Sequence, residues 1–299
     1  MLKTRFGVEI EFTGITRNKA AKVIAQQLES TITYIGRTYG KYTVRDTKRR
    51  TWSIMSDASI RSERKNNGQI ISASTDYRVE LVTPILKYES DINALQEIVR
   101  SLRRAGAFVN SSCGIHIHLD GAEHTAKSIK NFINIIASKN DLLYKALQIN
   151  ADRMSYCKKI DEKLVRRIKE KNPKTMSVLE DLWYEDYFGY RGDHYHDSRY
   201  HFLNLHSFFN GNHTVELRGF NSTMHAGVLR SYIVLALALN HQALTQRSAS
   251  SKKAQSDNDK FAMRTYLNRI GFIGEEFKNC REHLTKHLSG SAAWRYRAA

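Results

Sequence analysis

The sequence contains little cysteine or proline and has no long hydrophobic run. Three cysteines occur in 299 residues, they lie far apart, and they form no C-x-x-C pair. This usage argues against a disulfide framework and fits a reducing environment. The longest apolar run, residues 233–239, is far shorter than the roughly 20 residues of a membrane span, and the first dozen residues hold no apolar signal core. We therefore expect a cytoplasmic protein with no membrane partner.

Acidic residues are also in deficit. The chain has 47 Lys and Arg against 30 Asp and Glu, which gives a formal net charge of +17 and a pI near 9.7. Such an excess indicates an anionic partner, such as nucleotide phosphate, a nucleic acid or an acidic polymer, or else a solvated surface. With 41% hydrophobic residues, the chain has the composition of a folded protein. Its length suits one large domain or two smaller ones.

Strand-like and helix-like segments are mixed along the chain, which predicts an α+β fold. We expect one open antiparallel sheet with helices packed on one face and a helical insertion. A main domain is expected at 1–247, with the insertion at about 122–198, followed at 248–299 by a linker and a C-terminal helical appendage. An NGN turn between residues 200–208 and 213–220 predicts a hairpin. Hydrophobic periodicity predicts other strands at 5–12, 77–83 and 107–119, and helices at 17–29, 90–105 and 226–246.

Several of the predicted strands carry charged residues between apolar neighbours. In a strand, residues i and i+2 point to the same side, roughly 6.5–7 Å apart, so each such pair faces away from the core side. A single pair is typical of a solvated sheet face, because burying unpaired carboxylates is costly. Three pairs and one further glutamate share the pattern: Glu9 and Glu11, His116 and His118, Glu216 and Arg218, and Glu80.

Glutamate and histidine fill most of these positions in a chain that is otherwise strongly basic. Acidic groups gathered on one face of such a chain indicate divalent metal ions, because Mg²⁺ prefers carboxylate oxygens and keeps places for phosphate oxygens. Histidine is less usual for Mg²⁺, so it would admit Mn²⁺ or donate a hydrogen bond to a phosphate. A guanidinium at position 218 fits the stabilisation of a phosphoryl group in transfer. The pattern therefore favours metal ions and phosphate on one face of the sheet.

Four sequence blocks resemble the successive blocks of the amidoligase family. They are FGVEIEF, WSIMSDASI with YRVELVTPIL, SSCGIHIHLD, and RYHFLNLHSFFNGNHTVELRGFNST, and they occur in the family's order over about residues 5–225. This family belongs to the carboxylate–amine ligases that share the catalytic fold of glutamine synthetase and glutamate–cysteine ligase. The resemblance implies an open antiparallel sheet of that type, whose concave face binds ATP and two or three Mg²⁺ ions. It also implies that ATP phosphorylates a substrate carboxylate and that an amine then displaces the phosphate, forming an amide or isopeptide bond.

The resemblance also implies roles for individual residues. One histidine of the H-x-H strand, His118, would touch metal or phosphate, while His116 would face the reacting groups together with Arg218. The family's usual glycine between Asp57 and Ser59 is replaced by Ala58, so the turn there is expected to differ. The implied metal ligands are Glu9, Glu11, Glu80, His118 and Glu216, and the implied contacts to nucleotide or substrate are Asn204, Arg199, Asp57 and Ser59.

Two other classes of protein stay open at this point. A metal-dependent oxygenase or hydrolase of the jelly-roll type uses an H-x-H pair and a glutamate, but it would leave Glu9, Glu11 and Arg218 without a function. A nucleic-acid-binding protein without catalysis would account for the charge of +17. The leading interpretation is an ATP-dependent ligase that joins a carboxylate-bearing substrate to an amine-bearing one, with peptides and polyanions among the candidates. The basic charge leaves a nucleic acid open as a further partner.

Overall fold

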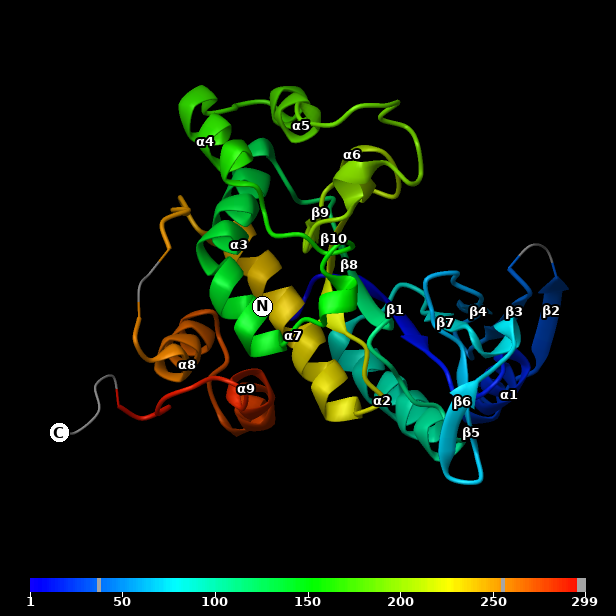
Figure 1. The fold of residues 1–299 in the computed structure, drawn as a ribbon. Helices are drawn as coiled ribbons and strands as arrows, with labels where there is room; N and C mark the ends of the chain where they lie inside the picture. The colour runs from blue at the N-terminus through cyan, green and yellow to red at the C-terminus, as the bar shows by residue number, and fades with distance from the viewer. Residues whose placement is uncertain (37–38, 254–255, 295–299) are drawn as a thin grey trace.

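The structure is a computed structural model that describes residues 1–36, 39–253 and 256–294, and its fold is α+β (Figure 1). Eight strands form one open antiparallel sheet in the order β2-β3-β4-β7-β1-β8-β10-β9, and β5 (Glu63–Asn66) and β6 (Gln69–Ser72) form a separate hairpin. This confirms the predicted fold class and the open sheet. The strands of the large sheet are β1 (Phe6–Phe12), β2 (Ile32–Gly36), β3 (Lys41–Arg45), β4 (Thr51–Met55), β7 (Val79–Val82), β8 (Gly114–Asp120), β9 (Leu203–Asn204) and β10 (Thr214–Asn221).

The large sheet has one apolar face, which three helices cover. The apolar residues of β1, β8 and β10 alternate along each strand and are at most 1% exposed. Helix α1 (Arg17–Gln27) packs on β3 and β4, α7 (Ala226–Thr245) packs on β8, and α2 (Tyr88–Arg104) packs against both helices. The core therefore lies between these helices and the sheet, and the opposite face of the sheet carries the polar residues of the same strands.

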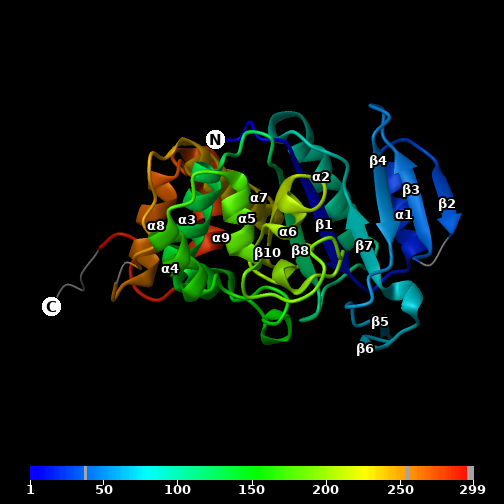
Figure 2. The ribbon, with the colours of Figure 1, turned by 90° about the horizontal axis from the view of Figure 1, so that it is seen from above.

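Further helices pack at the β10 end of the sheet (Figure 2). Helix α3 packs against α7 and β10, α4 and α5 pack near α3, and α9 packs on α7. Within the described ranges, no helix combines the length and the apolarity that a membrane crossing requires. The division into main domain, insertion and appendage stays a prediction, and its residues 254–255 and 295–299 lie outside the described residues. The further helices at this end of the molecule are α3 (Ala126–Leu147), α4 (Glu162–Lys171), α5 (Met176–Tyr184), α6 (His206–Phe209), α8 (Asp259–Arg269) and α9 (Lys278–Thr285).

The predicted hairpin around residue 210 is much shorter than expected. Its first strand is reduced to β9, because the side-chain Oδ1 of Asn204 accepts the N–H of His206 at 2.8 Å at the start of α6. The remaining pairing places Asn204 opposite Glu216. The predicted strand 107–119 likewise begins only at Gly114, and the exposed hairpin β5–β6 was not predicted because it lacks apolar alternation.

A bulge interrupts β10 next to the polar face. The register with β8 shifts between Leu217 and Phe220, and a side chain at Gly219 would meet the Phe202 ring at 1.8 Å. The buried guanidinium of Arg153 donates to the backbone oxygens of Arg218 at 2.8 Å and Phe220 at 2.6 Å. These bonds satisfy carbonyls that the bulge removes from the ladder. The bulge therefore depends on a residue that lies about sixty positions earlier in the chain.

Candidate active site

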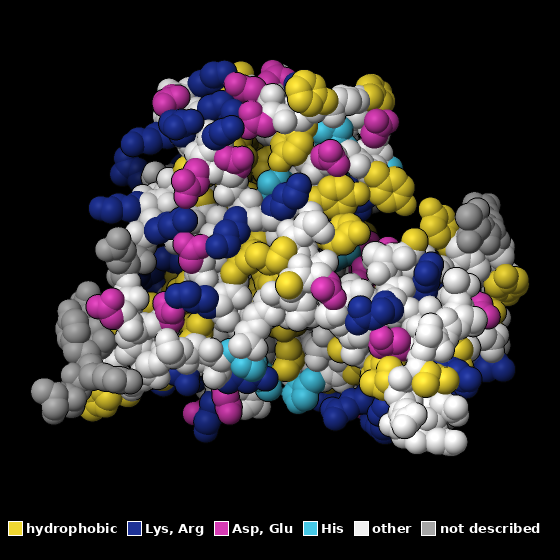
Figure 3. Space-filling model, viewed as in Figure 1, with side chains coloured by type: hydrophobic (Ala, Val, Ile, Leu, Met, Phe, Trp, Pro, Cys, Tyr) yellow, Lys and Arg dark blue, Asp and Glu magenta, His cyan; other side chains and the backbone are white. Residues whose placement is uncertain are grey.

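Strand register brings the polar residues of four neighbouring strands onto one surface. Glu11 of β1 lies opposite Glu80 of β7, Glu9 lies opposite His116 of β8, and His118 lies opposite Glu216 of β10. Directly opposed residues have Cβ atoms about 4.5–5.5 Å apart, so their side chains touch. We call the surface made by Glu9, Glu11, Glu80, His116, His118, Glu216 and Arg218 the polar floor. In the space-filling view, a hollow separates the α5–α6 region from the β2–β4 region, and acidic and histidine side chains show at its base (Figure 3).

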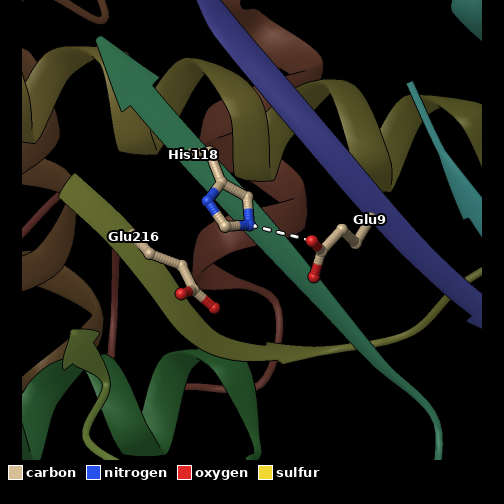
Figure 4. Close-up of side chains that lie close together, drawn as sticks. All are labelled: Glu9, His118 and Glu216. Carbon is tan, nitrogen blue, oxygen red and sulfur yellow. Dashed lines mark ion pairs between the residues drawn. The ribbon is translucent and has the colours of Figure 1, made fainter. Parts of the chain in front are cut away.

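Glu9 lies between the two histidines of β8. Its Oε2 is 2.9 Å from Nδ1 of His116, and its Oε1 is 3.2 Å from Nε2 of His118. Figure 4 shows the His118 ring turned toward Glu9, with Glu216 on the far side of the ring. Although burial opposes ionisation, these histidines hold the pKa of Glu9 well below its usual range. Glu9 is therefore a carboxylate near neutral pH.

The two histidines have opposite protonation tendencies. Burial first, and then the nearby charge of Arg218, lowers the pKa of His116, so this ring is neutral. For His118, burial acts in the same direction, but Glu9 and Glu216 outweigh it and raise the pKa to about 9. The H-x-H pair thus combines a neutral ring with one that carries a proton between two carboxylates.

Glu216 and Arg218 form a buried ion pair on β10. Nη1 of Arg218 lies 2.5 Å from Oε1 of Glu216, and Nδ2 of Asn204 donates to Oε2 of the same carboxylate at 2.6 Å. Burial opposes the charge on Glu216, but Arg218 and both histidines bring its pKa to about 2. The Nε of Arg218 is buried and has no hydrogen-bond partner among the described residues. This guanidinium therefore keeps one unpaired N–H donor within the site.

Glu11, Glu80 and Asp57 form the most acidic part of the site. Glu11 accepts the N–H of Gly114 at 2.6 Å, yet burial and the charge of Asp57 raise its pKa to about 7. Burial and the charges of Glu9, Glu11 and Asp57 raise the pKa of Glu80 well above its usual range. Carboxylates held this close repel one another, and either protons or a cation must relieve the repulsion.

Three overlapping groups, made of polar-floor residues and Asp57, could hold metal ions. Within each group, one ligand atom per residue lies within 4.8 Å of the others. The buried Nε2 of His118 lies 3.2 Å from Oε1 of Glu9 and has no other polar partner among the described residues, and a bound metal ion would displace the proton of this ring. Carboxylate oxygens with imidazole nitrogen match Mg²⁺ or Mn²⁺, and the mutual repulsion of the acids favours a cation. The groups are Glu9, His118 and Glu216; Glu9, Glu80 and His116; and Glu11, Asp57 and Glu80.

A pocket of about 470 Å³ adjoins the floor. It runs along β1 and β8 from Glu9 and His118 to the ion pair between Arg5 and Asp120, whose Nη2 and Oδ2 are 2.7 Å apart. Gly7 lies between these ends, and a Cβ added there would meet only the Cβ of His118, at 4.0 Å. A glycine inside a strand marks a place where another group approaches the backbone closely. The walls of the pocket also include Val82, Thr83, Pro84, Ile85, Asn212 and Thr214. The pocket is large enough to receive a small molecule whose end reaches the polar floor.

The structure places two of the predicted residues away from the polar floor. Ser59 is exposed, and its N–H and hydroxyl both donate to Oδ1 of Asp57 at 2.6 Å, so it orients Asp57. Ala58 does not adopt a left-handed conformation, and this turn therefore does not need the family's glycine. Arg199 donates to the carbonyl of His194 at 2.7 Å and stacks over Tyr195 at 5.4 Å, all within one loop. A hydrogen bond to Tyr39, in the turn before β3, raises the pKa of Tyr195, so this loop lies beside that turn.

Some residues that shape the site were not identified from the sequence. Gly7 belongs to the FGVEIEF block, and its position between Phe6 and Val8, on the polar side of β1, could have identified it. Arg153 gave no signal, because its partners are backbone carbonyls of a bulge that periodicity does not reveal. Arg5 and Asp120 lie just outside the apolar runs and became a pair only through strand register.

The fold and the polar floor define an α+β protein with a candidate site for metal ions beside a buried arginine. Residues 2–240 match the model of the family described as "Putative amidoligase enzyme". The chain belongs to this amidoligase family, and at that level it is an enzyme of the ligase type. The matched region contains every residue of the polar floor. A comparison with curated proteins found no match.

Proposed function

We propose that the chain is an ATP- and Mg²⁺-dependent carboxylate–amine ligase, with a catalytic sheet of the glutamine synthetase type in residues 1–247. The observation that carries this proposal is the polar floor, in which three candidate metal groups share members and lie beside the buried Arg218. The family membership supports the ligase class. A jelly-roll oxygenase or hydrolase fits less well, because eight of the described strands form one open sheet and the other two form only a small hairpin, rather than two large packed sheets.

Glu9, Glu11, Glu80, His118 and Glu216 would hold two or three Mg²⁺ ions, with Mn²⁺ as an alternative. Bound ions of this kind neutralise phosphate charge and align the attacking and leaving oxygens. The raised pKa of Glu11 and Glu80 supports the assignment, since a cation would supply the positive charge that these neighbouring carboxyls lack. Asp57 completes the third group, and Ser59 holds it in place.

Arg218 and His116 would act on the reacting groups. Phosphoryl transfer needs positive charge at the equatorial oxygens, and Arg218, which has one unpaired donor, would supply it. If Nδ1 of His116 donates to Glu9, the lone pair of its Nε2 is left on the ring, 4.0 Å from Glu11. We assign this neutral nitrogen the removal of a proton from the attacking amine.

The reaction would then proceed in two balanced steps. A substrate carboxylate oxygen attacks the γ-phosphorus of ATP, and ADP leaves with the bridging oxygen. The amine nitrogen next attacks the acyl carbon, phosphate leaves, and one proton passes to His116. The pocket beside Gly7 would hold one of the two organic substrates. Asn204 and Arg199 stay our proposed contacts to nucleotide or substrate.

Oxygen transfer tests this proposal directly. Purified protein is incubated with ATP, Mg²⁺ and candidate amines, together with candidate acids labelled with ¹⁸O in the carboxylate. We expect acid-dependent phosphate release and one ¹⁸O atom in the phosphate, because the acyl phosphate forms on the substrate's own oxygen. Arg218→Lys should lower both signals about 100-fold or more. Acid-dependent phosphate release without ¹⁸O, or a fully active Arg218→Lys variant, would show that the proposal is wrong.

A further inference from the structure

A second pocket lies on the helical side of the molecule, away from the polar floor. It has a volume of about 710 Å³ and lies between α2, the first turn of α7, and α9. These three helices pack against one another through α7, which covers the opposite face of the sheet from the polar floor. We call this cavity the basic pocket. Its lining includes Arg100, Arg103, Arg104, Arg230, His225 and His283.

The basic pocket is lined by four arginines and no acidic residue. Arg100 and Arg104 share one carboxylate, Glu97, which lies outside the lining, and the Arg104–Glu97 distance is 3.5 Å. Arg230 donates to the hydroxyl of Tyr88 at 2.7 Å, a partner that leaves its charge uncompensated. Arg103 has no ion pair within the described chain. Glu276 and Glu282, whose charges act on Arg230 and His283, do not line the cavity.

The start of α7 adds backbone donors to this cluster. His225 caps the helix through its Nδ1, which accepts the N–H of Val228 at 3.1 Å. The preceding N–H groups, of Ala226 and Gly227, have no partner in the described chain and lie in the lining. A Cβ at Gly227 would come within 3.0 Å of the His225 ring and 3.2 Å of the His283 ring, so the glycine leaves room beside both imidazoles. Guanidinium groups and helix N-termini both bind phosphate oxygens.

We propose that the basic pocket binds a small ligand with two or more phosphate groups. Four guanidinium groups on two helices, with two imidazoles beside them, exceed what one phosphate would need. The volume lies in the range of small-molecule sites, and the guanidinium groups come to this one cavity from α2 and α7. In Figure 3, basic and histidine side chains gather along the lower edge of the molecule, where α2, α7 and α9 lie in Figure 1. This inference does not depend on the ligase proposal.

Calorimetric titration with inorganic tripolyphosphate in EDTA tests the inference. Without Mg²⁺, the acidic polar floor repels the probe, so the basic pocket is measured alone. We expect Arg103→Ala to weaken binding at least tenfold, because one charge-assisted contact is removed. Arg64→Ala, which changes an exposed arginine of the β5–β6 hairpin, is the matched control and should stay within twofold of the wild type. Arg218→Lys should also leave this binding within twofold.

Four outcomes would overturn the inference. The first is no heat of binding at millimolar tripolyphosphate. The second is an equal effect of Arg103→Ala and Arg64→Ala, which would indicate general charge attraction. The third is a loss of binding only in Arg218→Lys, which would place the anion in the ligase site. The fourth is binding of a single-stranded oligonucleotide without binding of tripolyphosphate, which would make the surface a nucleic-acid interface. Arg230→Met is a second variant that removes a half-buried guanidinium and is expected to act like Arg103→Ala.

Discussion

Replacing Glu11 with glutamine should stabilise the metal-free protein while it abolishes activity. Glu11 is 4% exposed, and burial together with Asp57 raises its pKa from 4.5 to about 7. A carboxyl whose pKa is higher in the folded state than in the unfolded state contributes to stability. This contribution is complete at a pH below the unfolded-state pKa, and it is lost as the pH rises through the folded-state pKa. At pH 8 the native protein therefore bears the cost of an ionised Glu11, whereas glutamine carries no charge and can still accept the N–H of Gly114.

The size of the effect follows from the pKa difference. A shift from 4.5 to about 7 corresponds to about 3 kcal/mol at 1.36 kcal/mol per unit. The entropy of unfolding is roughly 2.1 cal/mol/K per residue, so 299 residues give about 0.6 kcal/mol per degree. We therefore expect Glu11→Gln to raise the Tm by about 5 °C at pH 8.

Thermal unfolding in EDTA at pH 8 and at pH 5 measures this difference. At pH 5 most of Glu11 is protonated, so the wild type and Glu11→Gln should unfold within about a degree of each other. Glu170→Gln, which removes an exposed carboxylate of α4, is the matched control and should shift the Tm little at either pH. Added Mg²⁺ should raise the Tm of the wild type more than that of Glu11→Gln. A lower Tm for Glu11→Gln at pH 8, or a difference that does not depend on pH, would refute the electrostatic reasoning.

Three further substitutions probe the site. Arg218→Lys keeps a positive charge beside Glu216 but loses the second donor edge of the guanidinium. Acid-dependent phosphate release should therefore fall about 100-fold or more, while the Tm changes by only a few degrees. Near-normal turnover would contradict this role. Gly7→Val should raise the KM of one organic substrate at least tenfold without lowering the Tm, since the added atoms enter only the pocket; an unchanged KM for both substrates would place them elsewhere. Arg153→Met leaves two buried carbonyls without donors and should lower the free energy of unfolding by about 3 kcal/mol in urea; a loss below 1 kcal/mol would show that the bulge holds without it.

Alternation along single strands predicted most of the polar floor, but it could not predict how the strands pair. The pattern places Glu9 and Glu11 on one side of β1, yet only register sets Glu9 against His116 and Glu11 against Glu80. The family's blocks supplied the expectation that these strands meet. Physical reasoning on one strand at a time cannot supply it, because a slip of two residues preserves the same faces.

Other parts of the site depend on contacts that no local pattern encodes. The short β9 results from a side chain–backbone bond at Asn204, which ends the strand where apolar alternation continues. The role of Arg199 at the nucleotide or substrate came from its position in a block and stays a prediction, since the structure gives only its contacts within its own loop. The helical elements were predicted better, since each has a continuous apolar stripe and α2 ends before Gly106, whose φ is +104°.

The strand order has a consequence for how the chain reaches its native state. Strand β1 is made early but occupies the middle of the sheet, where it pairs with β7 and β8. The hydroxyl of Ser222 donates to the backbone oxygen of Glu11 across 211 residues, so the first strand and the end of β10 close a very long loop. Such distant partners make folding slow. Until β10 has left the ribosome, the growing chain contains Glu9 and Glu11 but lacks Arg218. The polar floor therefore cannot balance its acidic charges until most of the chain has been synthesised.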